Sequence, residues 1–131
     1  MIYQPSNIYA TAQLGKDVNV AAFVEIGNNV TIGARTRIGA FSFIPEGVTI
    51  GRDVFIGPHV CFTNDRYPPA KREAWELTQV MDGAAIGAGC VILPGTTIGS
   101  RAIVGAGSVV TKSVPAGEIW CGNPAKFLRL R

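Results

Sequence analysis

Large apolar residues recur at every sixth position of this chain, and this period is its strongest signal. The residue two positions before each of them is small or β-branched, and the residue after it is often glycine. Side chains two residues apart share one face of a strand, whereas a period of six keeps no single face of a helix inward. Glycine adopts backbone angles that other residues avoid, so it suits a corner. The pattern therefore predicts short strands joined by corners.

Fifteen positions follow this period, on either side of one interruption. They are Ile8, Leu14, Val20, Ile26, Ile32, Ile38, Ile44, Ile50, Ile56 and Phe62, then Ile86, Ile92, Ile98, Val104 and Val110. Short strands joined by repeated corners form a coil, and stacked coils form parallel sheets with about 4.8 Å between strands. We therefore expect these fifteen side chains to point inward and to stack on one another.

The hexads IGNNVT, IGARTR, IGPHVC and IGAGCV carry the motif aliphatic–Gly–x–x–small–x. This motif resembles that of the hexapeptide-repeat acyltransferases, which fold as a left-handed parallel β-helix. The resemblance implies one all-β domain over residues 1–131 with three hexads per coil and about five coils. The repeats are expected over 6–62 and 84–111, with a C-terminal cap and coenzyme A segment over 112–131.

The interruption, residues 63–83, leaves the register intact, because the distance from Phe62 to Ile86 is a whole number of hexads. Loops of this length in compact domains are usually functional or disordered. This one contains Tyr67, Trp75 and Leu77, which favour packing over solvation. The family resemblance implies a homotrimer in which the loop reaches a neighbouring subunit. A loop folded back on its own coil is the alternative.

Composition narrows the function classes. The net charge of +3 is too small to indicate nucleic acid as a partner, and no apolar run is long enough to span a membrane. The three cysteines lack metal-ligand spacing and indicate a cytoplasmic protein with reduced thiols. Zinc carbonic anhydrases on this type of helix use three histidines, and this chain has one. We therefore predict no metal site.

The segments DVFIGPHVCFTNDRYPP and GAAIGAGCVILPGTTIG are similar to those of the N-acetyltransferases that act on nucleotide-linked 3-amino sugars. That resemblance implies that Asn64 lies beside the sugar amine. Asp65 is assigned to anchor the ammonium or to take a proton, although Asn-Asp is also a common turn pair. Phe62, Arg66 and Tyr67 are assigned to the substrate. The chain departs from this group in having no histidine in GAFSFIPEG, residues 39–47, and fewer coils before the loop.

His59 is the only histidine, and two readings of it remain open. It is a general base or an orienting group, or it is an exposed corner residue. A hydroxyl acceptor needs a base to remove its proton, whereas a neutral amine already has a lone pair. The absence of a histidine in the loop therefore favours an amine acceptor. The alternatives are an O-acetyltransferase that uses His59 as base and a non-catalytic β-helix scaffold.

The C-terminal segment VGAGSVVTKSVPAGEIWCGNPAKFLRLR resembles the family's coenzyme A segment. Small corner residues allow the pantetheine arm of acetyl-coenzyme A to approach the backbone, and cations near the C-terminus can neutralise its phosphates. The residues assigned to this donor are Gly87, Ala88, Gly105, Ala106, Lys112, Asn123, Pro124, Ala125 and Lys126. Together these features predict a trimeric, acetyl-coenzyme A-dependent N-acetyltransferase.

Overall fold

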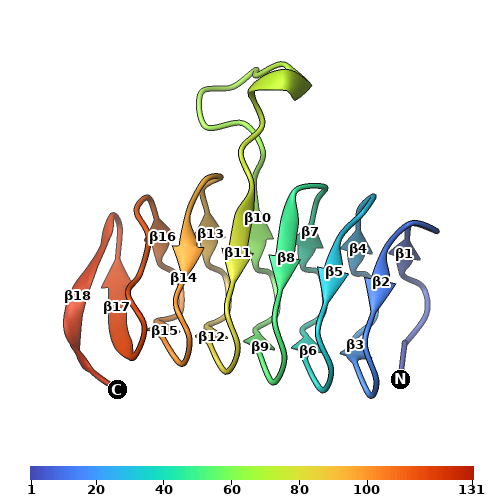
Figure 1. Ribbon diagram of the computed structural model, residues 1–131, viewed down its shortest axis with the longest axis horizontal. Coiled ribbons are helices and arrows are strands. Elements are labelled where there is room, and N and C mark those ends of the chain that lie inside the picture. The colour runs from blue at the N-terminus through green and yellow to red at the C-terminus, as the bar shows by residue number, and fades with distance from the viewer.

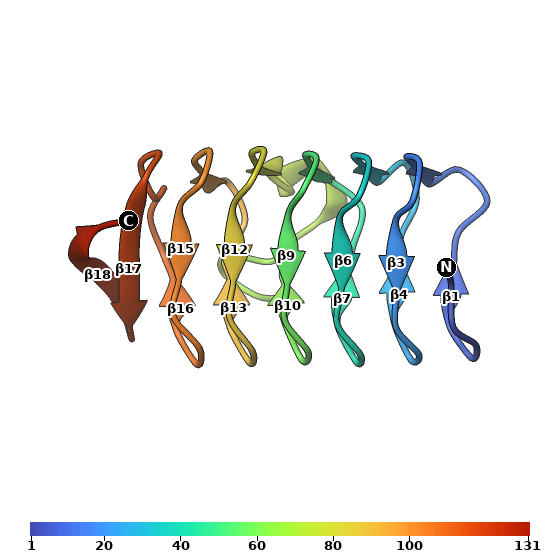
Figure 2. The ribbon, with the colours of Figure 1, turned by 90° about the horizontal axis from the view of Figure 1, so that it is seen from below.

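The computed structural model describes all residues, 1–131, as a three-sided parallel β-helix (Figure 1). Each coil contributes one short strand to each side, and strands of successive coils pair in parallel. Figure 2 shows the coils stacked side by side along the helix axis. The all-β β-helix predicted from the six-residue period is confirmed.

The three sides are called the first, second and third face, in chain order. The first face consists of β1 (Asn7–Ile8), β4 (Glu25–Ile26), β7 (Phe43–Ile44), β10 (Cys61–Phe62), β13 (Val91–Ile92) and β16 (Val109–Val110). The second face consists of β2 (Gln13–Leu14), β5 (Thr31–Ile32), β8 (Val48–Ile50), β11 (Thr78–Val80) and β14 (Thr97–Ile98). The third face consists of β3 (Asn19–Val20), β6 (Arg37–Ile38), β9 (Phe55–Ile56), β12 (Ala85–Ile86), β15 (Ile103–Val104), β17 (Glu118–Gly122) and β18 (Ala125–Leu130).

The periodic apolar residues fill the inside of the prism. Ile26, Ile50 and Ile98 are at most 1% exposed and belong to one continuous core cluster. Like side chains stack directly, since Ile26 pairs with Ile44 in the adjacent strand. Full burial of such a side chain contributes roughly 1.5–3 kcal/mol. The apolar stack therefore supplies the main stabilisation of the fold.

The inserted loop is shorter than the sequence suggested. Residues Thr78–Val80 form β11, which pairs with β8 and β14 on the second face, so the loop is Thr63–Leu77 rather than 63–83. Val80 lies three hexads after Phe62 and is buried, which means that the period resumes one hexad earlier than expected. The first face accordingly contains six strands, which gives about six coils instead of five.

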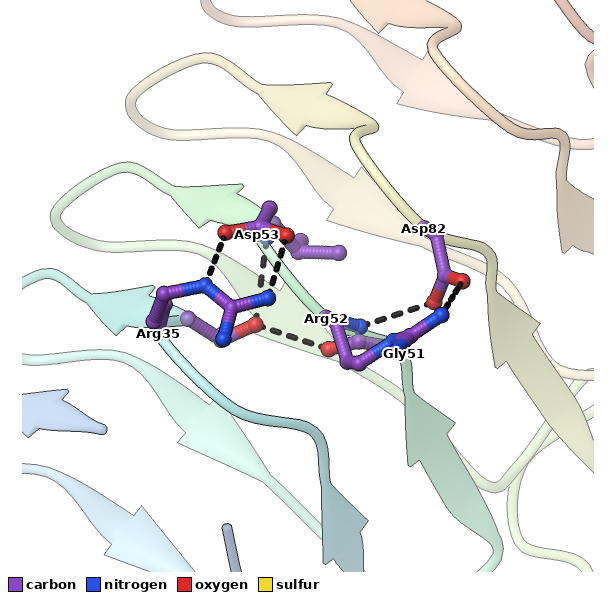
Figure 3. A network of polar contacts seen from close by, with 7 residues as sticks. Arg35, Gly51, Arg52, Asp53 and Asp82 are labelled. Carbon is purple, nitrogen blue, oxygen red and sulfur yellow. Dashed lines mark hydrogen bonds and ion pairs between the residues drawn. The ribbon is translucent and has the colours of Figure 1, made fainter. Parts of the chain in front are cut away.

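Corners between the second and third faces form the charged edge, defined by Arg35, Arg52, Asp53 and Asp82. Arg35 Nε donates to Asp53 Oδ1 at 2.8 Å, and the backbone N–H of Arg52 donates to Asp82 Oδ1 at 2.8 Å (Figure 3). Coils approach so closely here that a Cβ on Gly51 would lie 2.9 Å from the backbone nitrogen of Asp82. Glycine is therefore required at this corner.

A hairpin ends the helix at its C-terminus. β17 pairs in parallel with β15, and β18 then returns antiparallel to β17. Trp120 continues the inward stack above Val104, as expected for a capping residue. None of the helical segments has the length and hydrophobicity needed to cross a membrane.

Candidate active site

The loop Thr63–Leu77 leaves the prism between the first and second faces, along what we call the loop edge. It stands away from the coils and contains a short 3-10 helix, η1 (Arg72–Ala74) (Figure 1). Two arginines tie it back to the coils. Arg66 Nη2 donates to the carbonyl of Pro94 at 2.8 Å, and Arg72 Nε donates to Glu46 Oε2 at 3.2 Å. Glu46 thereby raises the pKa of the Arg72 guanidinium further above its usual value.

Two neighbouring cavities lie between the loop and the first face, with volumes of about 480 and 260 Å³. Phe43, Asn64 and Trp75 line both of them. The larger cavity is also bounded by Cys61, Phe62, Thr63, Asp65 and Pro68, and the smaller one by Tyr9, Glu25, Gly27, Asn28, Pro45 and Glu46. Asn64 therefore lies where a chamber lined by aromatic rings and by Asp65 meets a chamber lined by Glu25 and Glu46.

Asn64 and Asp65, which the sequence assigns to catalysis, both border the larger cavity. Trp75 Nε1 donates to Asp65 Oδ1 at 3.1 Å and so connects the outgoing and returning halves of the loop. Asp65 Oδ2 takes part in no hydrogen bond within the chain. An amide and a carboxylate beside an aromatic wall can orient a protonated or neutral amine.

Cys61 also faces the larger cavity. Burial raises the pKa of its thiol above the ordinary value, so this thiol stays protonated at neutral pH. Because the thiolate is the nucleophilic form, Cys61 is unsuited to form an acyl-enzyme intermediate. The chemistry of this cavity therefore favours direct transfer of the acyl group.

The three residues assigned to the substrate have different surroundings. Phe62 borders the larger cavity, but its ring is fully buried in the core and stacks on Ile92, so its assignment to the substrate stays a prediction. Phe62 occupies a position of the six-residue period, so its side chain is required to point inward. Arg66 is engaged with Pro94 and, at 3.4 Å, with Glu76, so it fastens the loop. Tyr67 is 82% exposed and projects from the loop.

His59 lies on a different edge of the prism, between the third and first faces. We call this the glycine edge, defined by Phe23, Phe41, His59, Gly89 and Gly107, which share positive φ angles. The imidazole stacks on Phe41 with ring centres 5.0 Å apart, and Phe41 stacks on Phe23 at the same spacing. Neither cavity at the loop is lined by His59. Proximity in sequence thus does not place His59 in this site within one chain.

The donor residues divide between two edges. Gly87, Ala88, Gly105 and Ala106 occupy corners of the glycine edge. The turn Asn123–Lys126 lies close to them, since the N–H of Gly122 donates to Ser108 Oγ at 3.0 Å. Ala125 is only 5% exposed, so its side chain packs inward. Lys112 follows β16 and lies on the loop edge, apart from the other donor residues.

The sequence assignment missed Phe43 and Trp75, which line both cavities. Phe43 is the outward neighbour of buried Ile44, and the strand alternation already predicted that it faces outward. Its partnership with the loop depends on the path of fifteen residues that follow no repeat. No group of three metal-ligating side chains is present in residues 1–131.

Comparison with known proteins places the chain in a family. Residues 29–64 and 78–112 match the family model "Bacterial transferase hexapeptide (six repeats)". The chain is 37% identical over 81 residues to a tetrahydropyridine-dicarboxylate N-acetyltransferase of Staphylococcus aureus, covering 62% of this chain and 32% of that protein. It is 35% identical over 116 residues to serine acetyltransferase 2 of Arabidopsis thaliana, covering 88% of this chain and 33% of that protein.

Among solved structures, PerB of Caulobacter crescentus, in complex with coenzyme A and GDP-perosamine, superposes with a TM-score of 0.85. Its sequence identity is 28%, over 97% of this chain and 56% of that one. The chain spans about a third of the length of the two curated relatives described above. The matched repeats lie on both sides of the loop and include β7 and β10, which border the larger cavity. The chain belongs to the bacterial transferase hexapeptide family.

Proposed function

We propose that this protein is an N-acetyltransferase that moves an acetyl group from acetyl-coenzyme A to the amine of a nucleotide-linked amino sugar. The observation that carries the proposal is the pair of cavities that meet at Asn64 without a histidine in either lining. A neutral amine can attack a thioester without a base, whereas a hydroxyl cannot do so readily. The similarity to PerB, solved with coenzyme A and a nucleotide-linked amino sugar, supports the same assignment.

In the proposed reaction, the amine nitrogen attacks the thioester carbon while Asn64 holds the amine in line. A carbon–nitrogen bond forms, the carbon–sulfur bond breaks, and coenzyme A leaves as a thiolate. The excess proton of the nitrogen passes to Asp65 Oδ2 or to solvent and finally to the thiolate. A backbone N–H stabilises the oxyanion of the tetrahedral intermediate. Alignment of two bound reactants contributes up to about 7–11 kcal/mol, so positioning supplies much of the rate.

The donor is assigned to the glycine edge, with its pantetheine arm beside Gly87 and Gly105 and its phosphates near the turn at Lys126. Because this edge and the loop edge lie on opposite sides of the first face, donor and acceptor meet only if a second copy contributes one of them. This division supports the homotrimer expected from the sequence. Cytoplasmic location stays a prediction from the cysteine content.

The test is release of coenzyme A thiol from acetyl-coenzyme A with matched amino and hydroxyl sugars linked to nucleotides. Turnover with the amino sugars only is expected. Asn64→Ala should lower kcat about 100-fold, by analogy with other side chains that position reacting groups. Gln13→Ala, on the exposed second face away from both cavities, is the matched control. Turnover with hydroxyl acceptors alone would contradict the amine assignment.

O-acetyl transfer is the second candidate, and the serine acetyltransferase relative favours it. In this case His59 of a partner subunit would act as the base for a hydroxyl acceptor. His59→Asn distinguishes the two mechanisms, because loss of a general base typically lowers kcat by about 10²–10⁴-fold. Direct attack by an amine predicts a much smaller loss.

A further inference from the structure

Three exposed aromatic side chains form a column along the glycine edge. The rings of Phe23 and Phe41 stack with their centres 5.0 Å apart and 6° between their planes, and the His59 imidazole stacks on Phe41 at 5.0 Å and 9°. All three residues have φ angles of 57–64°, so their side chains leave the backbone in the same direction in successive coils. Stacking on two further rings fixes the orientation of the exposed imidazole.

The column of side chains ends after His59. Gly89 and Gly107 occupy the same corner in the next two coils, and the N–H of Gly89 donates to the carbonyl of Pro58 at 2.9 Å, so the backbone continues without a break. A Cβ on either glycine would meet no atom of the chain within 4 Å. Eight residues with side chains adopt this backbone region in the chain, so such a corner tolerates a side chain. We call the open surface over these two glycines the glycine step.

The glycine step is bounded by His59 at one end and by the turn Asn123–Lys126 at the other. His59 follows β9, the two glycines follow β12 and β15, and the turn follows β17. Adjacent strands of a sheet lie about 4.8 Å apart, so the three intervals span roughly 14 Å. The pantetheine arm of coenzyme A is as long as about four residues of extended chain, which is also roughly 14 Å. An arm whose phosphates lie at the turn therefore reaches the imidazole with its sulfur.

We propose that the His59 imidazole is the end wall of the donor site and limits the length of the acyl group that the protein transfers. This inference rests on the proposed function, which assigns the donor to the glycine edge. The free face of the imidazole is turned toward the glycine step, because Phe41 covers the opposite face. The methyl group of an acetyl thioester packs against that free face, whereas the additional methylene groups of a longer acyl chain collide with it.

The position of this wall along the helix axis agrees with the position of the assigned acceptor. His59 and Asn64 flank the same strand, β10, so both lie in one coil. A donor that stops at His59 therefore presents its thioester carbon at the level of Asn64, which holds the amine under the proposed function. An arm that continued past Phe41 toward Phe23 would carry this carbon one or two coils away from that level.

The role of an end wall uses the flat face of the imidazole and not its nitrogen atoms. Histidine presents an apolar ring body together with a polar tip that stays hydrated, so the face can contact an acyl group while the nitrogen atoms remain in water. Phenylalanine at position 59 would continue the column of rings and preserve this face. A general base, by contrast, requires an imidazole nitrogen.

Binding of coenzyme A thioesters, measured by isothermal titration calorimetry, tests the wall. His59→Gly keeps a residue suited to the positive φ and extends the glycine step by one coil, about 4.8 Å, to the Phe41 ring. Its affinity for butyryl-coenzyme A relative to acetyl-coenzyme A should rise at least about 10-fold above the wild-type ratio, as is usual when a site admits methylene groups. His59→Phe should keep the wild-type ratio. An unchanged ratio in H59G, or the same raised ratio in H59F, would overturn the proposal.

A ring placed within the glycine step gives a second test. Gly107→Phe puts a side chain where the pantetheine arm is assigned, so measurable binding of acetyl-coenzyme A should be lost. Asp17→Phe introduces the same ring at a φ of 59° on the charged edge and is the matched control, which should bind as the wild type does. Circular dichroism checks that both variants keep the β-helix. Equal affinities of the two variants would show that the arm does not lie on the glycine step.

Turnover separates the wall from the proposed function. Loss of a general base would lower kcat for acetyl and butyryl donors by the same factor, so the ratio between the donors reports on the wall alone. A raised butyryl ratio in H59G together with no acetylation of any amine would refute the proposed acceptor and keep the wall. Amine turnover with one ratio in all three proteins would refute the wall and keep the function. A protein that binds no coenzyme A thioester would refute both.

Discussion

The charged edge and the glycine edge share the same corner geometry. They differ in whether their side chains find bonding partners within the chain. At the charged edge, Asp17, Arg35 and Asp53 have positive φ angles, and the last two of these form an ion pair within the chain. At the glycine edge, Phe41 and His59 have the same angles, yet their rings are exposed and no polar group of the chain binds the imidazole. The side chains of the charged edge therefore bind one another within a single chain. Those of the glycine edge are left exposed and available to a ligand or to a neighbouring copy.

The largest expected effect comes from placing a charge at Phe55, whose ring is exposed on the third face. We expect this face to pack against a neighbouring copy in the homotrimer. Phe55→Asp should therefore dissociate the homotrimer and reduce turnover by at least about 100-fold, because a desolvated, unpaired carboxylate costs several kcal/mol. Sedimentation measures the loss of the trimer, and an acetyl-transfer assay measures the loss of turnover. Thr49→Asp adds the same charge to the second face and should leave both unchanged. A trimeric F55D protein with full activity would show that the third face is free.

Two glycines of the glycine edge differ in the space around them. At one corner the adjacent coil leaves no room for a side chain, and at the other corner no atom of the chain lies nearby. A Cβ on Gly39 would collide with the backbone nitrogen of Pro58, so Gly39→Ala should destabilise the protein by about 3 kcal/mol through overpacking. Gly89 has a φ of +71° but open space around it, and Gly89→Ala should cost about 1–2 kcal/mol from strain alone. Urea unfolding at fixed protein concentration compares them. Equal losses in the free energy of unfolding would contradict this difference between the two corners.

Close packing inside the charged edge depends on one buried hydroxyl. Thr36 Oγ1 donates to the carbonyl of Gly51 at 2.7 Å and accepts from the N–H of Val54 at 3.1 Å. Thr36→Val keeps the shape but leaves both groups without a partner, which costs about 1–3 kcal/mol. Thr31→Val, on the exposed second face, is the matched control and should be nearly neutral. Thermal unfolding measures both variants, and equal midpoints for the two would refute the expectation.

The fold was predictable because every hexad repeats the same physical requirement: an aliphatic side chain inside and a tight corner after it. The end of the loop was missed at Thr78–Val80, although Val80 fits the period, because the surrounding residues carry no glycine corner of the usual kind. Asn64 and Asp65 were assigned through their local motif. Trp75 was missed because its contact with Asp65 joins two halves of a loop without periodicity.

The smallest effect is expected at the ion pair of the charged edge. The hydrogen bond from Arg35 lowers the pKa of the Asp53 carboxyl below its ordinary value. A carboxyl with a lowered folded-state pKa contributes stability above its unfolded-state pKa and loses that contribution as the pH falls through the folded-state pKa. Both side chains are more than half exposed, so water and salt screen the pair. Asp53→Asn should therefore lower the unfolding midpoint only slightly at pH 7, and the difference from wild type should vanish in acid. A difference that persisted at low pH or grew in high salt would show that the carboxylate acts through something other than Arg35.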